Sequence, residues 1–456
     1  MSHNFIDCDR EQDLLLPPSL REWLPEDHLA WFVLDAVEEM DLSAFYGAYR
    51  EDGWGRAAFD PQMMVALLLY GYGVGERSSR GIERRCREDI AFRVITANQV
   101  PDHATVARFR ARHEGALADT FVQVLALCAR TGLLSVGVVA LDGSLLAGNA
   151  SPQATRSYAS IREEVERMLA EAARADAEQD ERLGDARGDE LPAELVNPRS
   201  RRERLRRCKE QLEREQADEQ AAHEANLAWR AAWEREHGRR LAGRKPTPPD
   251  PAALAARKMN TSDPDTRLMK RAGGRSVRGY NAQVVASPEQ VIVAAQVTQS
   301  HNDADQLEPM VGKAGDALRE AGIEEPIGIV LADGGYWNSP AIANVRAQGI
   351  DVLIPTQDRR RTRPRKLSPR QGDEAQRIEA VLSTPEGQAL YRRRQQIVEP
   401  VFAHTKFIRR SDRFLRRGLA ACQAEWQLIA ATHNLLKLWR AGLTQTGTAI
   451  PQPLAG

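Results

Sequence analysis

The chain has 456 residues, of which 28% are charged, and its formal net charge is −1 at pH 7. This length suffices for two or three domains with sizeable cores. No apolar run approaches the roughly 20 residues of a membrane span, and Met1–Asp7 lacks the charged and apolar regions of a secretory signal. Five cysteines without a CxxC pair argue against a zinc site, so we expect a cytoplasmic protein in a reducing compartment.

Residues 1–133 are predicted to form an all-α domain. Asp60-Pro61 supplies a helix cap followed by a proline at the first helical position. Two later basic helices, joined by a polar turn, are compatible with a helix-turn-helix-like DNA-binding unit. The same pattern also fits an ordinary helical bundle with solvated arginines. The basic residues of these helices are Arg84, Arg85, Arg87, Arg108, Arg110 and Arg112.

Residues 134–150 contain an apolar run that predicts a buried strand ending at Asp142. A second such run ends at Asp333. A carboxylate just past a buried strand lies at the sheet edge where open α/β sheets place their sites. Taken alone, each aspartate stands beside a glycine and is equally typical of an ordinary turn.

Residues 151–275 interrupt the strand pattern with two long, charged segments of helical periodicity. They predict an antiparallel helical hairpin with a narrow apolar seam, followed by a proline-rich exit at 245–251. Trp229 and Trp233 lie four residues apart, and we expect them to pack in this seam rather than to stack on exposed bases.

Strand and helix patterns then alternate to the end of the chain. A hairpin is predicted around Ser287-Pro288-Glu289, and a basic loop over 359–370. A helix from about 376 to 410 contains Glu399, and Pro400 should either kink it or restart it. The remaining predictions are helices at 305–321, 339–348 and 424–439, a strand at 350–355 and a disordered tail at 443–456.

The three acids Asp142, Asp333 and Glu399 suit metal-dependent phosphodiester chemistry. Two strand-end aspartates and a helix glutamate can together hold two divalent ions for an in-line phosphoryl displacement. Other carboxylates lie in loops, where capping or structural roles are expected; these are Asp263, Asp265, Asp303 and Asp305.

Six motifs occur in a specific order. They are Leu141–Ser144, Asn260–Asp265, Gly279–Gln283, Asp333–Trp337, Glu399–Phe402 with Lys406 seven residues after Glu399, and His433–Leu435. In this order and spacing the chain resembles the DDE transposases of bacterial insertion sequences, from about Phe5 to Leu438. One departure is that Tyr391 and Arg394 stand one place upstream of the family's helix signature, whereas the interval from Glu399 to Lys406 fits.

The resemblance implies an α/β catalytic core with an RNase H-like mixed sheet flanked by helices, formed by 134–150 and 276–442. An all-α N-terminal domain and the helical hairpin insertion would complete the fold. Asp142 is then the bridging ligand of two Mg²⁺ or Mn²⁺ ions, Asp333 binds one ion and Glu399 binds the other. The residues expected to contact DNA are Lys406, Arg394, Tyr391, Arg108, Arg110, Arg112, Arg359, Arg360, Arg361, Arg409 and Arg410.

The implied function is transposition of an insertion sequence, with binding to terminal inverted repeats, strand cleavage and strand transfer. The implied partners are double-stranded DNA and a second copy of the chain when the two ends are paired, with the protein at the nucleoid when it is bound to DNA. Two alternatives remain at this point, a DNA-binding regulator without activity and an RNase H-like nuclease without strand transfer. A coiled-coil scaffold leaves the strand-end aspartates unexplained.

Overall fold

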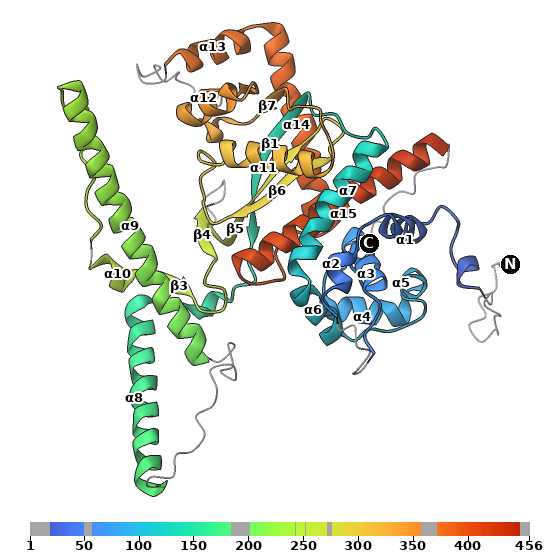
Figure 1. Ribbon diagram of the computed structural model, residues 1–456, viewed down its shortest axis with the longest axis horizontal. Helices are drawn as coiled ribbons and strands as arrows, with labels where there is room; N and C mark the ends of the chain where they lie inside the picture. The colour runs from blue at the N-terminus through green and yellow to red at the C-terminus, as the bar shows by residue number, and fades with distance from the viewer. Residues whose placement is uncertain are drawn as a thin grey trace, which may run out of the picture. The chain divides into compact units, whose positions relative to one another are not determined.

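The computed structural model describes residues 19–49, 57–183, 201–241, 243–250, 252–270, 276–356 and 372–446. The chain divides into two compact units (Figure 1). Unit 1 comprises Met1–Ala147 with Lys270–Gly456, and unit 2 comprises Gly148–Met269. The N-terminal helices therefore belong to the same unit as the sheet. The basic loop at 359–370 lies outside the described residues, whereas the terminal helix continues into the predicted tail as far as Thr446.

The N-terminal part of unit 1 is all-α, as predicted. The Asp60 side chain accepts from the backbone N–H of Gln62, and Pro61 occupies the first helical position of α3, so the predicted cap is present. Helix α3 is almost entirely buried and forms the centre of this part. The elements are η1 (Leu20–Glu22), α1 (Leu29–Glu38), α2 (Ser43–Tyr46), α3 (Pro61–Gly73), α4 (Ser79–Glu88), α5 (Ile90–Ile95), α6 (His103–Arg112) and α7 (Glu114–Arg130).

A mixed sheet forms the rest of unit 1. β1 (Val138–Ala147) pairs antiparallel with β5 (Ser276–Ala286), which pairs antiparallel with β6 (Ile292–Thr298). On its other side β1 pairs in parallel with β7 (Ile329–Leu331), and β7 pairs in parallel with β8 (Asp351–Leu353). This mixed sheet with flanking helices is compatible with an RNase H-like core.

Helices from the second half of the chain pack on the sheet, and α15 lies alongside α7 (Figure 1). One hydrophobic core runs through the N-terminal helices, the sheet and these helices, because apolar side chains from all of them meet there. The elements are α11 (Leu307–Glu320), η4 (Gly334–Tyr336), α12 (Ser339–Ala347), α13 (Gly372–Ser383), α14 (Pro385–Ala403), the π-helical turn η5 (His404–Ile408) and α15 (Leu419–Thr446).

Pro400 does not restart a helix, because α14 continues through it to Ala403. A proline has no N–H to donate, so the carbonyl of Gln396, four residues earlier, loses its helical partner. The side-chain Nε2 of Gln290 donates to that carbonyl at 3.0 Å. The helix therefore tolerates Pro400, and the single predicted helix over 376–410 is instead α13, α14 and η5.

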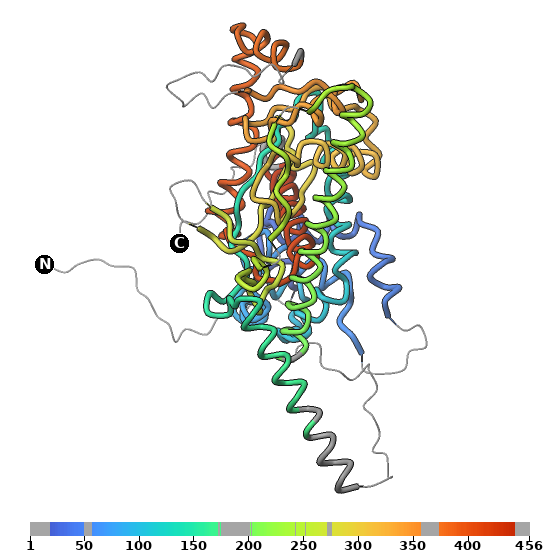
Figure 2. The backbone as a smooth tube through the Cα atoms, turned by 90° about the vertical axis from the view of Figure 1, so that its left-hand side faces the viewer, coloured from blue at the N-terminus to red at the C-terminus, as the bar shows by residue number. Residues whose placement is uncertain are grey.

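Unit 2 contains two long helices, α8 (Tyr158–Leu183) and α9 (Arg201–His237), the latter running without a break in Figure 2. They share a small apolar cluster near their first turns. Trp229 is 57% exposed and Trp233 stacks on His237, so the expectation that both tryptophans pack in the seam is wrong. The other elements of this unit are η2 (Pro152–Ala154), β2 (Thr155–Ser157), α10 (Ala253–Ala256) and β3 (Lys258–Asn260). The strand β4 (Arg267–Lys270), an edge strand of the six-stranded sheet, spans the boundary of the two units.

Within the described parts of the chain, no helix combines the length and the apolar character needed to cross a membrane.

Candidate active site

Asp142 and Asp333 lie at the same level of the sheet on adjacent strands. The parallel pairing of β1 and β7 ends with Ala140 opposite Leu331, and each aspartate follows two residues later. Asp333 comes after the end of β7, where its side chain accepts from the N–H of Gly335 at 2.8 Å. Asp142 does not end its strand as predicted, because β1 continues to Ala147 against β5. The two carboxylates are nevertheless neighbours, as expected.

The Asp142 carboxylate is held by two donors. Its Oδ2 forms an ion pair with the guanidinium of Arg394 at 3.0 Å, and its Oδ1 accepts from the N–H of Gly143 at 2.8 Å. The pKa of Asp142 is raised to about 6, chiefly by burial; the Arg394 guanidinium and the N–H of Gly143 oppose this rise, and the nearby carboxylates of Asp333 and Asp303 contribute to it. Negative charge is therefore crowded at this point of the sheet.

Asp303, for which the sequence predicted a capping or structural role in a loop, also lies near Asp142. Its Oδ1 accepts from Asn281 Nδ2 at 2.8 Å and from Gln283 Nε2 at 2.7 Å. Its charge acts on Asp142 and also raises the pKa of Tyr336, although burial is the larger cause there. The Asp303 backbone carbonyl accepts from Gln306 N.

Two basic side chains from the α14–η5 segment reach the strand that carries Asp142. Arg394 pairs with Asp142, and Lys406 Nζ donates to Ser144 Oγ at 2.8 Å. The buried Nε of Arg394 has no hydrogen-bond partner among the described residues. A buried donor without a partner is costly, so a ligand oxygen at this position would satisfy it. Tyr391, one turn before Arg394, is half-buried.

Glu399 is placed differently from the two aspartates. It is exposed on α14, five residues after Arg394. Five residues rotate by about 140° around a helix of 3.6 residues per turn, so the two side chains leave the helix in different directions. Within the described residues, no three His, Cys, Asp or Glu side chains stand close enough to hold one metal ion. The structure thus unites Asp142 and Asp333 but not Glu399, whose metal-binding role stays a prediction.

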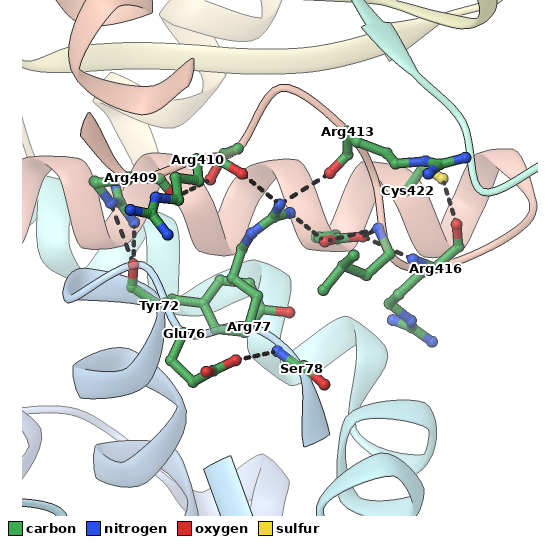
Figure 3. Close-up of polar contacts among 12 residues, drawn as sticks. Tyr72, Glu76, Arg77, Ser78, Arg409, Arg410, Arg413, Arg416 and Cys422 are labelled. Atoms are coloured by element: carbon green, nitrogen blue, oxygen red, sulfur yellow. Dashed lines mark hydrogen bonds and ion pairs between the residues drawn. The ribbon is translucent and has the colours of Figure 1, made fainter. Parts of the chain in front are cut away.

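Arg409 contradicts its expected role in DNA binding. Its side chain is buried, and its guanidinium donates to the backbone oxygen of Tyr72 (Figure 3). It also donates to the backbone oxygen of Ile429. Burial lowers its pKa to about 9, helped by neighbouring cations. A guanidinium occupied in this way fastens the N-terminal helices to α15 and does not reach a phosphate. This role could not be predicted from the sequence, because Arg409 stands in a basic run with Arg410 and Arg413.

The remaining predicted DNA contacts fall into three groups. Arg108, Arg112 and Arg410 are exposed. Arg110 is half-buried and donates to Tyr72 Oη and to the backbone oxygen of Arg77, so its contacts are internal. Arg359, Arg360 and Arg361 lie outside the described residues. In the helical region, α5 separates the two basic helices α4 and α6, so they are not joined by a turn alone.

Asp263 and Asp265 belong to unit 2, where Asp263 is buried and its N–H donates to Asn260 Oδ1. Asp305 is exposed and accepts from Asn338 Nδ2 at 3.2 Å. Asp265 accepts from Gln211 Nε2 at 3.4 Å. The local structural roles expected for these three carboxylates stay predictions.

Two family models match the chain. The transposase domain DUF772 matches residues 18–112, and the transposase DDE domain matches residues 254–435. Together they cover more than half of the chain, including the N-terminal helices, Asp333, Glu399 and most of the sheet. No curated protein and no solved structure matched it. The chain belongs to the DDE transposases of insertion sequences.

Proposed function

We propose that this transposase acts on the ends of its own insertion sequence. It binds the terminal inverted repeats, hydrolyses a phosphodiester bond to free a 3′-hydroxyl, and uses that hydroxyl to attack target DNA. The observation that carries this proposal is the placement of Asp142 and Asp333 at one level of adjacent parallel strands, facing cations from the α14–η5 segment. Acids and phosphate-binding cations are the two components that metal-dependent phosphoryl transfer requires.

The residues at this site fit a divalent metal. Carboxylate oxygens are the hard ligands that Mg²⁺ and Mn²⁺ prefer, and the carboxylates of Asp333 and Asp303 lie near enough to Asp142 to raise its pKa, although burial is the larger cause. Asp142 and Asp333 would hold the ions, and Glu399 is the predicted third ligand. Bound ions would activate the attacking water or 3′-hydroxyl and stabilise the leaving oxygen.

The protein's own cations would position the DNA. Arg394 has a buried Nε that lacks a hydrogen-bond partner among the described residues, and this Nε can donate to a phosphate oxygen beside Asp142. Lys406 presents its ammonium two residues further along the same strand, at Ser144. Contacts of this kind fix the register of the DNA backbone without reading its sequence. The exposed arginines Arg108 and Arg112 of α6 are proposed to contribute to binding of the inverted repeats.

Two copies of the chain would pair the two ends of the element. The alternatives are a regulator that binds without cleaving and a nuclease that cleaves without joining. Both are outcomes of the experiment that tests the proposal.

The experiment incubates the protein and Mg²⁺ with a donor DNA that carries the native ends, and resolves nicks, excised ends and joined products. We compare wild type with Asp142→Asn, Glu399→Gln and Glu386→Gln. Glu386 is a matched control because it is an exposed glutamate in the first turn of the same helix as Glu399. Excision and joining by wild type and Glu386→Gln, lost in the other two variants, would support the proposal.

Other outcomes would overturn parts of it. Specific binding without cleavage by wild type would identify the regulator, and nicks without joined products would identify the nuclease. Full activity of Glu399→Gln would remove Glu399 from the ligand set and leave the two aspartates in place.

A further inference from the structure

The turn that carries Lys406 is attached to the catalytic strand at two places. η5 follows α14 directly, and Lys406 Nζ donates to Ser144 Oγ on β1, two residues after Asp142. Beyond the turn, the segment 412–414 forms two backbone hydrogen bonds, of 3.2 and 2.8 Å, with Ala147 at the end of the same strand. The position of the Lys406 ammonium therefore depends on the backbone path between these two attachments.

Arg410 gives this path a strained bend. Its φ is 52°, the left-handed conformation that a residue with a Cβ rarely adopts. Such a conformation persists only where the surrounding contacts impose it. One of these contacts lies within the turn, where Ser411 N donates to Thr405 O at 2.9 Å. Another comes from a side chain outside it.

The outside contact is the guanidinium of Arg77. This side chain is 5% exposed, and its Nη2 donates to the backbone oxygens of Arg410 and Arg413, each at 3.0 Å (Figure 3). Its Nη1 pairs with the Glu425 carboxylate, which orients the guanidinium. Because a guanidinium presents its donors in a rigid planar fork, one side chain sets the spacing of the two carbonyls.

Arg77 is also attached to the helix that is proposed to bind the inverted repeats. Arg110 of α6 donates to the backbone oxygen of Arg77 at 2.7 Å. Arg108 and Arg112 of the same helix are exposed. Arg77 therefore supports the turn that carries Lys406 and is itself supported by α6.

We propose that Arg77 is a positioning residue for phosphoryl transfer and that it acts through Lys406. By holding the carbonyls of Arg410 and Arg413, it fixes the turn so that the Lys406 ammonium meets the phosphate beside Asp142. This inference rests on the proposed function and adds to it a buried residue that does not itself contact DNA.

The test is a double-mutant cycle on single-turnover cleavage of an element-end substrate by the full chain with Mg²⁺. Wild type is compared with Arg77→Lys, with Lys406→Ala and with the two combined. Arg77→Lys keeps a cation opposite Glu425 and removes the fork that holds the two carbonyls. The matched control is Arg130→Lys, because Arg130 is an exposed arginine that also pairs with a glutamate.

We expect Arg77→Lys to lower the cleavage rate about 10- to 100-fold, since a displacement of about 1 Å at a reacting group can cost about 100-fold. Once Lys406 is alanine, Arg77→Lys should cause no further loss, because residues that act as a unit give non-additive effects. A merely structural role of Arg77 would not depend on Lys406. Arg130→Lys should cleave like wild type.

The outcomes separate this inference from the proposed function. If the two losses multiply in the combined variant, or if Arg77→Lys cleaves like wild type, the inference is overturned and the proposed function stands. Absence of cleavage by wild type would overturn both. Urea unfolding checks that each variant is folded. Should Arg77→Lys not fold, the neutral pair Arg77→Gln with Glu425→Gln decides in the same way, because it leaves no uncompensated buried charge.

Discussion

Arg77 and Glu425 form a buried ion pair, 2.8 Å between Nη1 and Oε1, that joins the N-terminal helices to α15. The second guanidinium nitrogen of Arg77 donates to the backbone oxygens of Arg410 and Arg413, as Figure 3 shows. Glu425 in turn accepts from the backbone N–H groups of Leu415 and Arg416. The Arg77–Glu425 pair and its hydrogen bonds therefore hold the segment 410–416, which follows η5, in place.

Removing one partner of this pair should destabilise unit 1 strongly. Arg77→Ala leaves the Glu425 carboxylate buried without its cation, and an uncompensated buried charge costs about 3–5 kcal/mol. Urea unfolding of the variant against wild type measures the change. Arg130→Ala is the control, because Arg130 and Glu39 are both 61% exposed and an exposed pair contributes about 0–1 kcal/mol. Equal effects of the two substitutions would show that the pair at Arg77 is not structural.

Gly143→Ala should reduce DNA cleavage without unfolding the protein. The added methyl group would collide with the Gln283 and Asn281 amides, and the resulting shift beside Asp142 should lower the cleavage rate about 100-fold. The assay is single-turnover cleavage of an element-end substrate. Gly312→Ala on α11 is the matched control for Gly143→Ala, because a Cβ added at Gly312 would have no other atom within 4 Å. A Gly143→Ala protein with the rate of wild type would argue against a tight fit at this strand.

Lys406→Ala should weaken DNA binding and flatten its salt dependence. Loss of one phosphate contact on duplex DNA lowers the slope of log K against log salt by about 0.9. Fluorescence anisotropy with an element-end duplex at several salt concentrations measures this slope. Lys313→Ala on α11, an exposed lysine, serves as the comparison. An unchanged slope for Lys406→Ala would mean that Lys406 donates to Ser144 but does not contact a phosphate.

The basic segment at 359–370 has its own prediction. Replacing Arg359, Arg360, Arg361, Arg363, Arg365 and Lys366 with alanine should weaken binding to all DNA sequences and reduce the salt slope by several units. The same anisotropy series tests it. Retention of the full slope would exclude this segment as a contact to the DNA backbone.

The buried pair of His404 and His433 should make stability depend on pH. Their Nδ1 atoms lie 2.9 Å apart, and His433 Nε2 contacts the backbone oxygen of Gln290. Two neutral rings satisfy this arrangement when His433 donates to Gln290 and accepts from His404, whereas two charged rings would place a donor against a donor. Burial lowers the pKa of His404 to about 3, and it also lowers the pKa of His433. Since the unfolded chain takes up protons below its ordinary pKa of about 6.5, stability contributed by the neutral pair is lost as pH falls from there toward 3.

The expected size is about 1.4 kcal/mol per pH unit for each histidine below pH 6. Urea unfolding at pH 7.0 and pH 5.0 measures it for wild type and for the double variant His404→Gln, His433→Gln. The double variant should lose less stability on acidification than wild type. The exposed His301→Gln should behave like wild type, and identical pH dependence of all three proteins would refute the prediction.

The strand-end aspartates show what the sequence could reveal. An apolar run that stops at an acid is visible in the chain, and it led to Asp333 and Asp142, although the end of β1 was placed too early. The pairing of strands could not be predicted from the sequence. β1 continues past Asp142 because it pairs antiparallel with β5, so the predicted end of the strand was too early. Asp303 was treated as a local loop residue for the same reason. Its amide partners are 20 and 22 residues away along the chain.

Burial was the other property that the sequence concealed. Arg409 and Arg410 are neighbours in one basic run, yet the first is buried against α15 and the second is exposed. Trp229 shows the reverse, an aromatic residue at helical spacing that stays in solvent. Residue type alone predicts exposed arginines and buried tryptophans, and tertiary contacts decide against it at these positions.

Helices α3 and α15 come from opposite halves of the chain and share one core, and Arg409 joins α15 to the backbone of α3. A fragment ending after residue 112, or one beginning at residue 254, would therefore expose apolar surface that each part covers for the other. We therefore expect that an isolated N-terminal fragment and an isolated catalytic fragment of this transposase would both be insoluble. Its parts are best separated by point substitutions within the whole chain.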